Sequence, residues 1–388
     1  GGTGVMRGSH MTASGGKRVT VVAVAAAMDQ IAPPALAQSW DNVGLLVGDR
    51  QALCRRVLLC IDLTPAVLAE AVASRCEMIV SYHPPLFKPV KRIVADSDGT
   101  EAIVHEAIRG GIAIYSPHTA LDAAEGGVND VLAGLCGLKD VGPFEYVPVG
   151  RREYKVVTFV PFAQLEEVAS AMFAAGAGRI GDYEQCSHRL RGEGTFFGTE
   201  STSPQVGRKG QLERVAETRI EMVCAERYLP EVIAALRRSH PYEEPAFDIY
   251  PLTPEPTAGI GRVGTLPEGT TLAGLAKSLK RATRSRVLMT VGEPNTKLRR
   301  AAVCGGSAGR MPLEMPRASA CDVIVTGEIR HHDALSILRA GKTAIALGHW
   351  ESERPVLAPL NKRLKQTLGA IDVRLSRKDA PPFQSGSF

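Results

Sequence analysis

The 388 residues suffice for two or three domains, and a composition of 44% hydrophobic and 22% charged residues is that of an ordinary globular protein. The net charge of +5 is small, and Lys and Arg are spread among Asp and Glu, so the composition gives no support for nucleic-acid binding. No uninterrupted apolar run approaches the roughly 18 residues of a membrane span, so we expect a soluble protein.

The cysteines and the first residues indicate the compartment and the start of the fold. Eight cysteines are scattered without a CxxC pair, several of them inside apolar runs. This pattern favours reduced, buried thiols and a cytoplasmic location over a disulfide framework. The opening GGTGVMRGSHMTASGG lacks the order of a signal peptide, and its GSHM resembles a cloning remnant. We therefore leave residues 1–16 out of the fold prediction.

Residues 17–150 predict alternating helices and strands. The segment VTVVAVAAAMDQIAPP predicts a helix that ends before Pro33 and Pro34, because proline cannot donate the next helical hydrogen bond. The runs VLLCIDLT, EMIVSYHPPLF and IAIYS are typical of strands buried on both faces, and PAVLAEAVASR and AIVHEAIRGG between them are helix-like. This alternation predicts a parallel sheet.

The pattern changes near residue 150. Strands are predicted at YKVVTFV, DYEQCSHRL, ETRIEMVCA and AFDIYPL, and helices at LEEVASAMFAAGA and LPEVIAALRRS. Two βαβ halves in series are typical of the split βαβ, ferredoxin-like arrangement. We predict that residues 151–252 form an inserted α+β domain, which the Pro- and Gly-rich linker LTPEPTAGIG closes.

The α/β pattern returns after this linker. Strands are predicted at RAAVCGG, CDVIVTGE, KTAIALGHW and AIDVRLS, with helices at TLAGLAKSLKRA, HHDALSILRAG and RPVLAPLNKRLKQTL. Residues 17–150 and 253–388 are therefore expected to form one discontinuous α/β body with mainly parallel sheets.

Three histidines follow predicted strands directly: His83, His118 and His349. Ligands of open α/β sheets bind outside the carboxyl ends of the strands, so this placement predicts one convergent site. His349 and Glu353 stand four apart, as do His118 and Asp122, and such residues share one face of a helix. Histidine and carboxylate ligands without cysteine suit Zn, Mn, Fe or Ni. Taken singly, each histidine fits a hydrogen-bonded structural role better than a metal-binding one, and only the three together bring the metal interpretation level with it.

Two further stretches carry polar groups that suit either function or structure. In TGEIRHHDAL, Glu328 and His332, and less so His331, could move protons near a metal, or could simply cap a helix. In WDNVGLL, Asp41 and Asn42 could contact a ligand, but we expect them to position a loop.

Two motifs give weaker indications. CGGSAGR resembles a phosphate-binding loop after a strand but lacks the full GxGxxG or P-loop pattern. The two glutamates of HPYEEP are expected to stabilise a turn or a subunit contact.

The motifs WDNVGLLVG, SYHPPLF, YSPHTALDAAEGGVND, TGEIRHHDAL and GHWESE occur in this order, interrupted by a domain that carries HPYEEPAFDIYPL. Together they closely resemble the NIF-three-like family, the GTP cyclohydrolase I type 2 homologues, from about Val19 to Leu375. The resemblance implies a dinuclear metal site with His83, Asp122, His349 and Glu353 as ligands. It also implies a toroidal homohexamer with sites facing an internal cavity, and an insert similar to PII-like and cation-tolerance proteins.

Tyr82 departs from the family pattern, because many members have a histidine there, in a His-His-Pro motif. A neutral phenol is a poor ligand beside imidazole, since its oxygen binds well only when deprotonated and its ordinary pKa is about 10. The second metal position is therefore expected to be weaker, rebuilt with His118 or water, or absent. His118 is expected to be either a ligand or a residue that orients one. We expect one or two divalent ions per chain and no other cofactor.

The resulting expectation is a metal-dependent hydrolase that acts on a small, nucleotide-like molecule. His83, Asp122, His349 and Glu353 would hold the metal, and Glu328 or His332 would move protons. The alternative is a non-catalytic metal-binding regulatory or scaffold oligomer, which Tyr82 favours. A transcription-related interaction role, suggested by the family name, gains no support from the modest charge.

Overall fold

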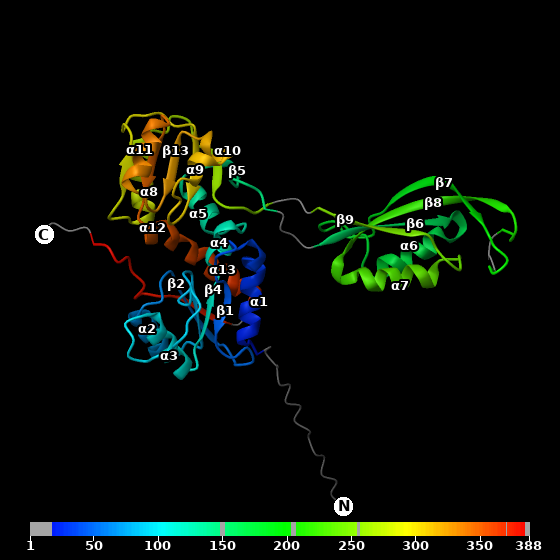
Figure 1. Cartoon of the computed structure of the whole chain (residues 1–388), viewed down its shortest axis with the longest axis horizontal. Coiled ribbons are helices and arrows are strands. Elements are labelled where there is room, and N and C mark those ends of the chain that lie inside the picture. Colours follow the sequence, from blue (N-terminus) through cyan, green and yellow to red (C-terminus); the bar gives the residue numbers. More distant parts are fainter. Residues whose placement is uncertain (1–17, 148–151, 203–206, 254–256, 370, 385–388) are drawn as a thin grey trace, which may run out of the picture. The chain divides into compact units, whose positions relative to one another are not determined.

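The computed structural model describes residues 18–147, 152–202, 207–253, 257–369 and 371–384, and the predicted remnant at residues 1–16 lies outside them. The chain divides into two compact units (Figure 1). Gly1–Val147 and Thr257–Phe388 together form one unit, here called the body unit. Pro148–Pro256 forms the other, here called the inserted unit.

The body unit contains a five-stranded sheet of order β1-β4-β3-β2-β15. Its strands are β1 (Gly44–Val47), β2 (Arg56–Cys60), β3 (Met78–Ser81), β4 (Ala113–Ser116) and β15 (Asp372–Leu375). All neighbours are parallel except β1, which is antiparallel to β4. The helices around this sheet are α1 (Val21–Ile31), α2 (Pro65–Ala73), α3 (Thr100–Arg109) and α13 (Leu357–Leu368). Thr64 caps α2, where its hydroxyl accepts a hydrogen bond from the amide of Val67.

A six-stranded sheet of order β11-β14-β13-β12-β10-β5 forms the other half of the body unit. Its strands are β5 (Lys139–Gly142), β10 (Arg262–Thr265), β11 (Met289–Val291), β12 (Arg300–Cys304), β13 (Val323–Thr326) and β14 (Thr343–Ala346). Its helices are α5 (Val128–Leu135), α8 (Leu272–Thr283), α9 (Met311–Glu314), α10 (Pro316–Ser319) and α11 (His331–Arg339).

The expectation of mainly parallel sheets is wrong for this second sheet. Only β12, β13 and β14 run parallel, whereas β11, β10 and β5 each join by antiparallel pairing. β5 and β11 are mostly exposed, whereas the parallel strands β13 and β14 are buried along their whole length, so only the parallel strands show the continuous apolar run that identified the central strands.

The inserted unit is a four-stranded antiparallel sheet of order β7-β8-β6-β9 with two helices. Its elements in chain order are β6 (Glu153–Pro161), α6 (Leu165–Ala174), β7 (His188–Phe197), β8 (Leu212–Ala225), α7 (Leu229–Ser239) and β9 (Phe247–Leu252). This alternation and strand order are those of a split βαβ unit. Val156, Ile220 and Met222 pack against α6 and α7 in its core. The likeness to PII-like proteins stays a prediction.

The β7–β8 hairpin is longer than predicted, because its strands pair from His188–Glu221 to Phe197–Leu212. Most side chains along β7 are exposed, so this strand lacks the apolar alternation that reveals a strand in a sequence.

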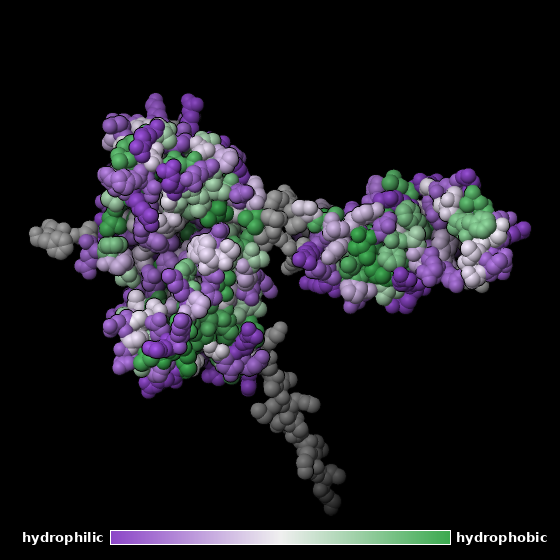
Figure 2. Space-filling model, in the orientation of Figure 1, coloured by the Kyte–Doolittle hydropathy of each residue, from purple (hydrophilic) through white to green (hydrophobic). Residues whose placement is uncertain are grey.

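The surface exposes mainly hydrophilic side chains (Figure 2), and the cysteines are mostly buried. Hydrophilic side chains cover most of the visible face of each unit, with smaller apolar patches between them (Figure 2). All eight cysteines are free, seven of them buried and Cys186 half-buried. Within the described residues, no helix has both the length and the apolar character needed to cross a membrane.

Candidate metal centre

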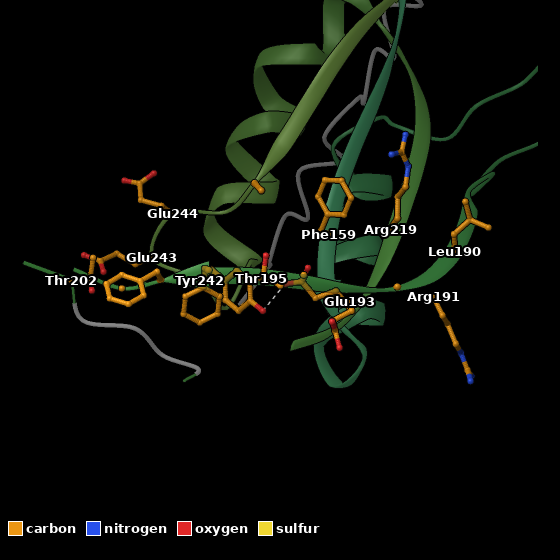
Figure 3. A pocket seen from close by; sticks show the side chains of 17 residues that line it. Phe159, Leu190, Arg191, Glu193, Thr195, Thr202, Arg219, Tyr242, Glu243 and Glu244 are labelled. Atoms are coloured by element: carbon orange, nitrogen blue, oxygen red, sulfur yellow. Dashed lines mark hydrogen bonds between the residues drawn. The ribbon is translucent and has the colours of Figure 1, made fainter. Parts of the chain in front are cut away.

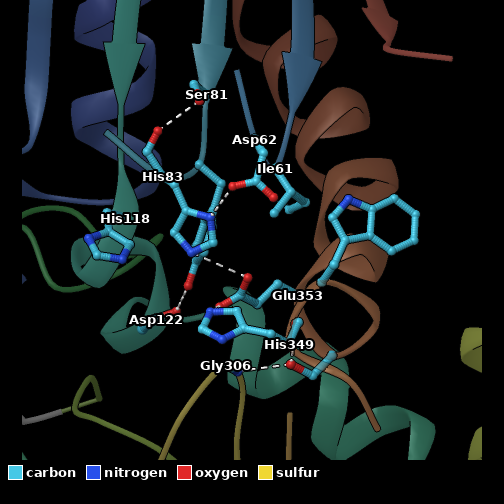
Figure 4. A network of polar contacts seen from close by, with 12 residues as sticks. Ile61, Asp62, Ser81, His83, His118, Asp122, Gly306, His349 and Glu353 are labelled. Atoms are coloured by element: carbon cyan, nitrogen blue, oxygen red, sulfur yellow. Dashed lines mark hydrogen bonds and ion pairs between the residues drawn. The ribbon is translucent and has the colours of Figure 1, made fainter. Parts of the chain in front are cut away.

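Strand ends from both sheets of the body unit place three histidines together. His83 follows β3, His118 opens the short helix α4 (His118–Ala123) after β4, and His349 opens α12 (His349–Glu353) after β14. The ring of His83 lies 5.3 Å from that of His118 and 5.4 Å from that of His349, measured between ring centres (Figure 4). The convergence comes from the position of each histidine at the carboxyl end of a strand.

Glu353 links two of these histidines. One oxygen, Oε1, lies 3.2 Å from Nε2 of His349, and the other, Oε2, lies 3.5 Å from Nε2 of His83. Among the described residues, these three side chains are the one set of His, Cys, Asp or Glu whose ligand atoms all lie within 4.8 Å of one another. Glu353 is only 2% exposed, and its Oε2 has no hydrogen-bond partner in the described part of the chain. A divalent cation between the three groups would satisfy this buried oxygen, so the residues fit a metal.

Each of the three histidine rings contacts a carboxylate of its own through Nδ1. The pairs join Nδ1 to a carboxylate oxygen: His83–Asp62 at 2.9 Å, His118–Asp41 at 2.8 Å and His349–Glu328 at 2.7 Å. Such a partner fixes the ring and leaves Nε2 as the ligand atom, an arrangement that metal-binding histidines commonly have. Asp62 was not predicted, although its place at the end of the VLLCID run, beside the strand that leads to His83, could have indicated it.

These contacts shift the pKa values of the cluster in opposite directions. Burial opposes the imidazolium charge, but the hydrogen bond to Asp62 and the nearby carboxylate of Glu353 raise the pKa of His83 to about 10. The hydrogen bond to Glu353 outweighs burial and raises the pKa of His349 to about 9. The same two imidazoles hold the pKa of Glu353 below its usual value, although burial opposes this. Without metal, both rings are therefore protonated at neutral pH.

Metal binding should accordingly release protons. A metal ligand must be a neutral imidazole, so an ion that binds at pH 7.5 displaces the protons of His83 and His349, about two per ion. The release should shrink as the pH rises through 9 to 10, where the metal-free rings lose these protons themselves. Titration calorimetry in buffers of different ionisation enthalpy measures this number. Release of no proton at pH 7.5 would exclude these two rings as the ligands.

Asp122 lies beside the cluster and is held by Tyr82. The Tyr82 hydroxyl donates a hydrogen bond to Oδ1 of Asp122 (Figure 4 labels Asp122). Burial, together with the carboxylates of Asp122 and Glu353, raises the pKa of Tyr82 well above 10, so the phenol is a neutral donor. Burial also raises the pKa of Asp122 to about 7, although the Tyr82 hydrogen bond opposes the shift. Asp122 is thus near the three clustered side chains but outside their set.

Comparison with known proteins now identifies the family. The model of the Duf34/NIF3 (NGG1p interacting factor 3) family matches residues 19–382. The chain belongs to this family. A Mycobacterium tuberculosis relative called GTP cyclohydrolase 1 type 2 homolog is 39% identical over 347 residues, which cover 88% of this chain and 90% of the relative. A relative of the same name from Halalkalibacterium halodurans is 38% identical over 357 residues, covering 90% and 95% of the two chains.

Solved structures give the same assignment. The crystal structure of a Bacillus cereus protein related to NIF3 matches with a TM-score of 0.79 at 33% identity, over 96% of this chain and all of that one (100%). A Staphylococcus aureus structure matches with a TM-score of 0.78 at 29% identity, over 95% and 99% of the two chains. The mixed α/β fold with several sheets is therefore the NIF3 fold.

The WDN segment of this NIF3 chain anchors the His118 side of the site. Asp41 accepts hydrogen bonds from the amide (3.0 Å) and the hydroxyl of Thr119, in addition to its contact with His118. These bonds outweigh burial and lower the pKa of Asp41 to about 2. Asn42 donates from Nδ2 to the carbonyl of Leu86 at 2.5 Å. Both residues therefore join loops, as the sequence predicted.

His118 itself has a strained backbone. Its φ is 23°, a value that non-glycine residues rarely adopt and that costs roughly 1–3 kcal/mol. Such outliers cluster at functional sites, which supports a role for His118 beyond beginning α4.

The CGGSAGR motif lies against the metal ligands. Gly306 has a φ of 66°, and a Cβ there would lie 2.5 Å from Oε1 of Glu353 and 3.2 Å from Nε2 of His349. Only glycine allows the loop to approach this closely. The amide of Gly306 donates to the Ser352 hydroxyl at 2.8 Å, which fixes the loop to α12.

The structure separates the two predicted proton carriers. Glu328 contacts His349, whereas His332 lies in the first turn of α11, with its ring 5.3 Å from that of His331. Across the described residues, no hydrogen bond, ion pair or ring contact joins His331 or His332 to the cluster. Glu328 therefore contacts the cluster through His349.

Proposed function

We propose that this NIF3-family protein is a divalent-metal-dependent hydrolase that acts on a nucleotide-like substrate. The observation that carries the proposal is the buried Glu353 carboxylate, which lies between the Nε2 atoms of His83 and His349. The relatives called GTP cyclohydrolase 1 type 2 homolog support the reaction class, hydrolysis of a bond in a nucleotide.

The chain's own residues would bind and orient. His83, His349 and Glu353 would hold one ion with Asp122 beside them, and His118 with Asp122 would serve a second position. A Zn, Fe, Mn or Ni ion bound there would supply Lewis acidity, which makes water a better nucleophile at neutral pH. Asp62 and Glu328 would keep the imidazoles in place, so Glu328 is a positioning residue. His332 remains the proposed proton carrier.

Aromatic and basic side chains beside the cluster suit a nucleotide. Trp40 is 59% exposed. The centre of its ring lies 6.1 Å from that of His118 and 5.8 Å from that of Phe87. Exposed aromatic rings bind nucleobases by stacking. Phe87 also lines a cavity of about 570 Å³ whose basic side chains are Lys88, Lys91 and Arg92. A base on Trp40 with its phosphates on this basic loop would lie next to the metal ligands.

The test is metal-dependent turnover of nucleotides. Protein purified without chelator and then loaded with Zn, Fe, Mn or Ni is incubated with nucleoside triphosphates including GTP, and the products are identified by mass spectrometry. We expect turnover that chelator removes and that Glu353→Gln lacks. A protein that binds metal but converts no nucleotide would favour the alternative, a non-catalytic metal-binding regulatory or scaffold oligomer. Tyr82 is the observation that favours this alternative.

We also propose that the chain forms the homohexamer implied by its family and works in the cytoplasm. Sedimentation equilibrium should give six times the 41.4 kDa of one chain. A monomer at micromolar concentration would contradict the hexamer.

Trp40→Ala should weaken substrate binding more than it slows turnover. Loss of one stacking surface costs about 1–3 kcal/mol, so KM should rise about tenfold or more while kcat changes little. Steady-state kinetics measure both values. Tyr183→Ala, which removes an exposed aromatic ring of the inserted unit, is the matched control and should change neither. An unchanged KM in Trp40→Ala would remove Trp40 from the substrate site.

A further inference from the structure

A second cavity lies in the inserted unit, on the sheet face that α6 and α7 do not cover. Its volume of about 650 Å³ is in the range of small-molecule sites. Val156 and Ile220 point to the helices, and successive residues of a strand point to opposite faces. Phe159, Glu217 and Arg219 therefore lie on the open face, where they line the cavity (Figure 3).

Two glycines of β7 make the cavity floor flat. Gly192 pairs in register with Glu217, and a Cβ on Gly192 would meet no atom within 4 Å, so the space above it is open. A Cβ on Gly194 would instead collide with Oε2 of Glu217. Glycine inside a strand often marks a place where another molecule approaches the backbone closely.

The HPYEEP motif builds one wall of this cavity. The Nε2 atom of His240 donates to the carbonyl of Phe159 at 2.8 Å, and its Nδ1 accepts from the amide of Tyr242 at 3.1 Å. Burial lowers the pKa of His240, which keeps the ring neutral and suited to both bonds. The Tyr242 hydroxyl donates to Oε1 of Glu217 at 2.7 Å, and its ring lies 6.2 Å from that of Phe196.

The charges of the lining favour a ligand that donates hydrogen bonds over an anion. Arg219 is bound through Nε to Glu221 at 2.7 Å and lies 5.7 Å from the centre of the Phe159 ring. Arg191 lies over the ring of Phe162, at 5.5 Å. Both cations of the lining therefore already have partners. Glu217 has further lone pairs beyond the one that Tyr242 uses, and these can accept from a ligand.

We propose that this cavity binds a flat aromatic molecule that carries two adjacent N–H donors at its edge, as a benzamidine or a guanine does. The ring lies on the Gly192–Gly194 floor beside Phe159 and Tyr242, and its donors bond to the Glu217 carboxylate. This site belongs to the inserted unit alone and does not depend on the metal chemistry of the body unit.

The experiment titrates the full-length chain with p-aminobenzamidine and, separately, with guanosine, by calorimetry. We expect one site per chain for at least one probe. Gly192→Phe fills the open space and should abolish binding. Glu217→Gln keeps the size of the side chain but removes its charge, and should weaken binding about tenfold or more, the usual cost of losing a charged hydrogen bond. The matched controls are Gly134→Phe, an exposed glycine of α5 with open space around it, and Glu226→Gln, and both should bind as wild type does.

The two probes distinguish a neutral ligand from a cationic one, although both present adjacent N–H donors. Binding of guanosine alone indicates a neutral heterocycle, and binding of p-aminobenzamidine alone indicates a cation. Circular dichroism verifies that the variants fold, and Glu217→Gln decides the matter if Gly192→Phe does not. The proposal is overturned if neither probe binds at about 10 mM, well above ordinary dissociation constants for such sites. It is also overturned if binding survives in both Gly192→Phe and Glu217→Gln.

Discussion

Glu353→Gln is expected to cost the protein its metal while leaving its fold in place. Glutamine has the size of glutamate but cannot supply a charged oxygen to an ion between His83 and His349. Loss of a residue that only orients a metal ligand by a hydrogen bond already costs about 10–100-fold in metal affinity. Loss of a buried ligand should therefore cost more than about 100-fold. Competition titration with a chromophoric chelator measures the change, and elemental analysis gives the metal content of the purified protein.

Thermal unfolding supplies an independent measurement of the same variant. An ion present at about 100 times its dissociation constant stabilises the folded state by about 2.7 kcal/mol. Chelator should therefore lower the unfolding temperature of the wild-type protein and leave that of Glu353→Gln unchanged.

The control for Glu353→Gln is available in the same helix. Glu351 is also a buried carboxylate of α12, but it is not part of the metal-ligand set. Glu351→Gln should therefore keep both the metal and the response to chelator. If Glu353→Gln retained wild-type metal content, the cluster would not be the binding site, and the proposed hydrolytic function would lose its main support.

The metal cluster was partly predictable because its residues follow local rules. His83 and His349 each follow the carboxyl end of a short apolar strand, the position at which α/β sheets bind ligands, although the two strands belong to different sheets. His349 and Glu353 are four residues apart, so one turn of α12 brings them together. The central parallel strands were predictable for a similar reason, since burial on both faces leaves a continuous apolar run.

The rest of the site depends on contacts between residues far apart in the chain. The pairing of His83 with Asp62 needs β2 and β3 to be neighbours in register, and the pairing of His349 with Glu328 needs the same of β13 and β14. Residue types alone could not distinguish Glu328 as a positioning group from Glu328 as a proton carrier. The strands β1, β5, β10 and β11 were missed because none shows the buried apolar run of the central strands: β5 and β11 are mostly exposed, β1 is largely half-buried, and β10 contains Arg262 and Gly264.

The cavity of the inserted unit was missed for another reason. The residues that form it include three glycines, and one of its walls is a motif whose glutamates suggested only a turn or a subunit contact. A cavity is space between side chains from several strands, and hydrophobic periodicity does not record such space. The role of the HPYEEP motif depends on a contact between residues distant in the sequence, because the Tyr242 hydroxyl bonds Glu217 across the sheet face.

Tyr82→His tests whether this residue limits the number of metal ions. In the structure, Tyr82 is buried and its neutral hydroxyl bonds Asp122, so it occupies an acceptor that a second ion would use. A histidine would add an imidazole beside His83 and leave the Asp122 oxygen to the metal. We expect the metal content to rise from about one ion per chain to about two, the number of a two-metal hydrolytic centre. Elemental analysis of protein prepared without chelator measures it.

Tyr82→Phe separates the two effects of that substitution. It removes the hydrogen bond to Asp122 without adding a ligand, so its metal content should stay at about one ion per chain if an imidazole is what the second position needs. If the phenylalanine variant also gains an ion, the Tyr82 hydroxyl alone blocks Asp122, and His118 with Asp122 suffices for the second position. In a Tyr82→Phe protein that holds two ions, the additional change His118→Ala should reduce the count to about one, because His118 is the remaining imidazole at that side of the cluster. About two ions in the wild-type protein would show that Tyr82 does not limit the metal content.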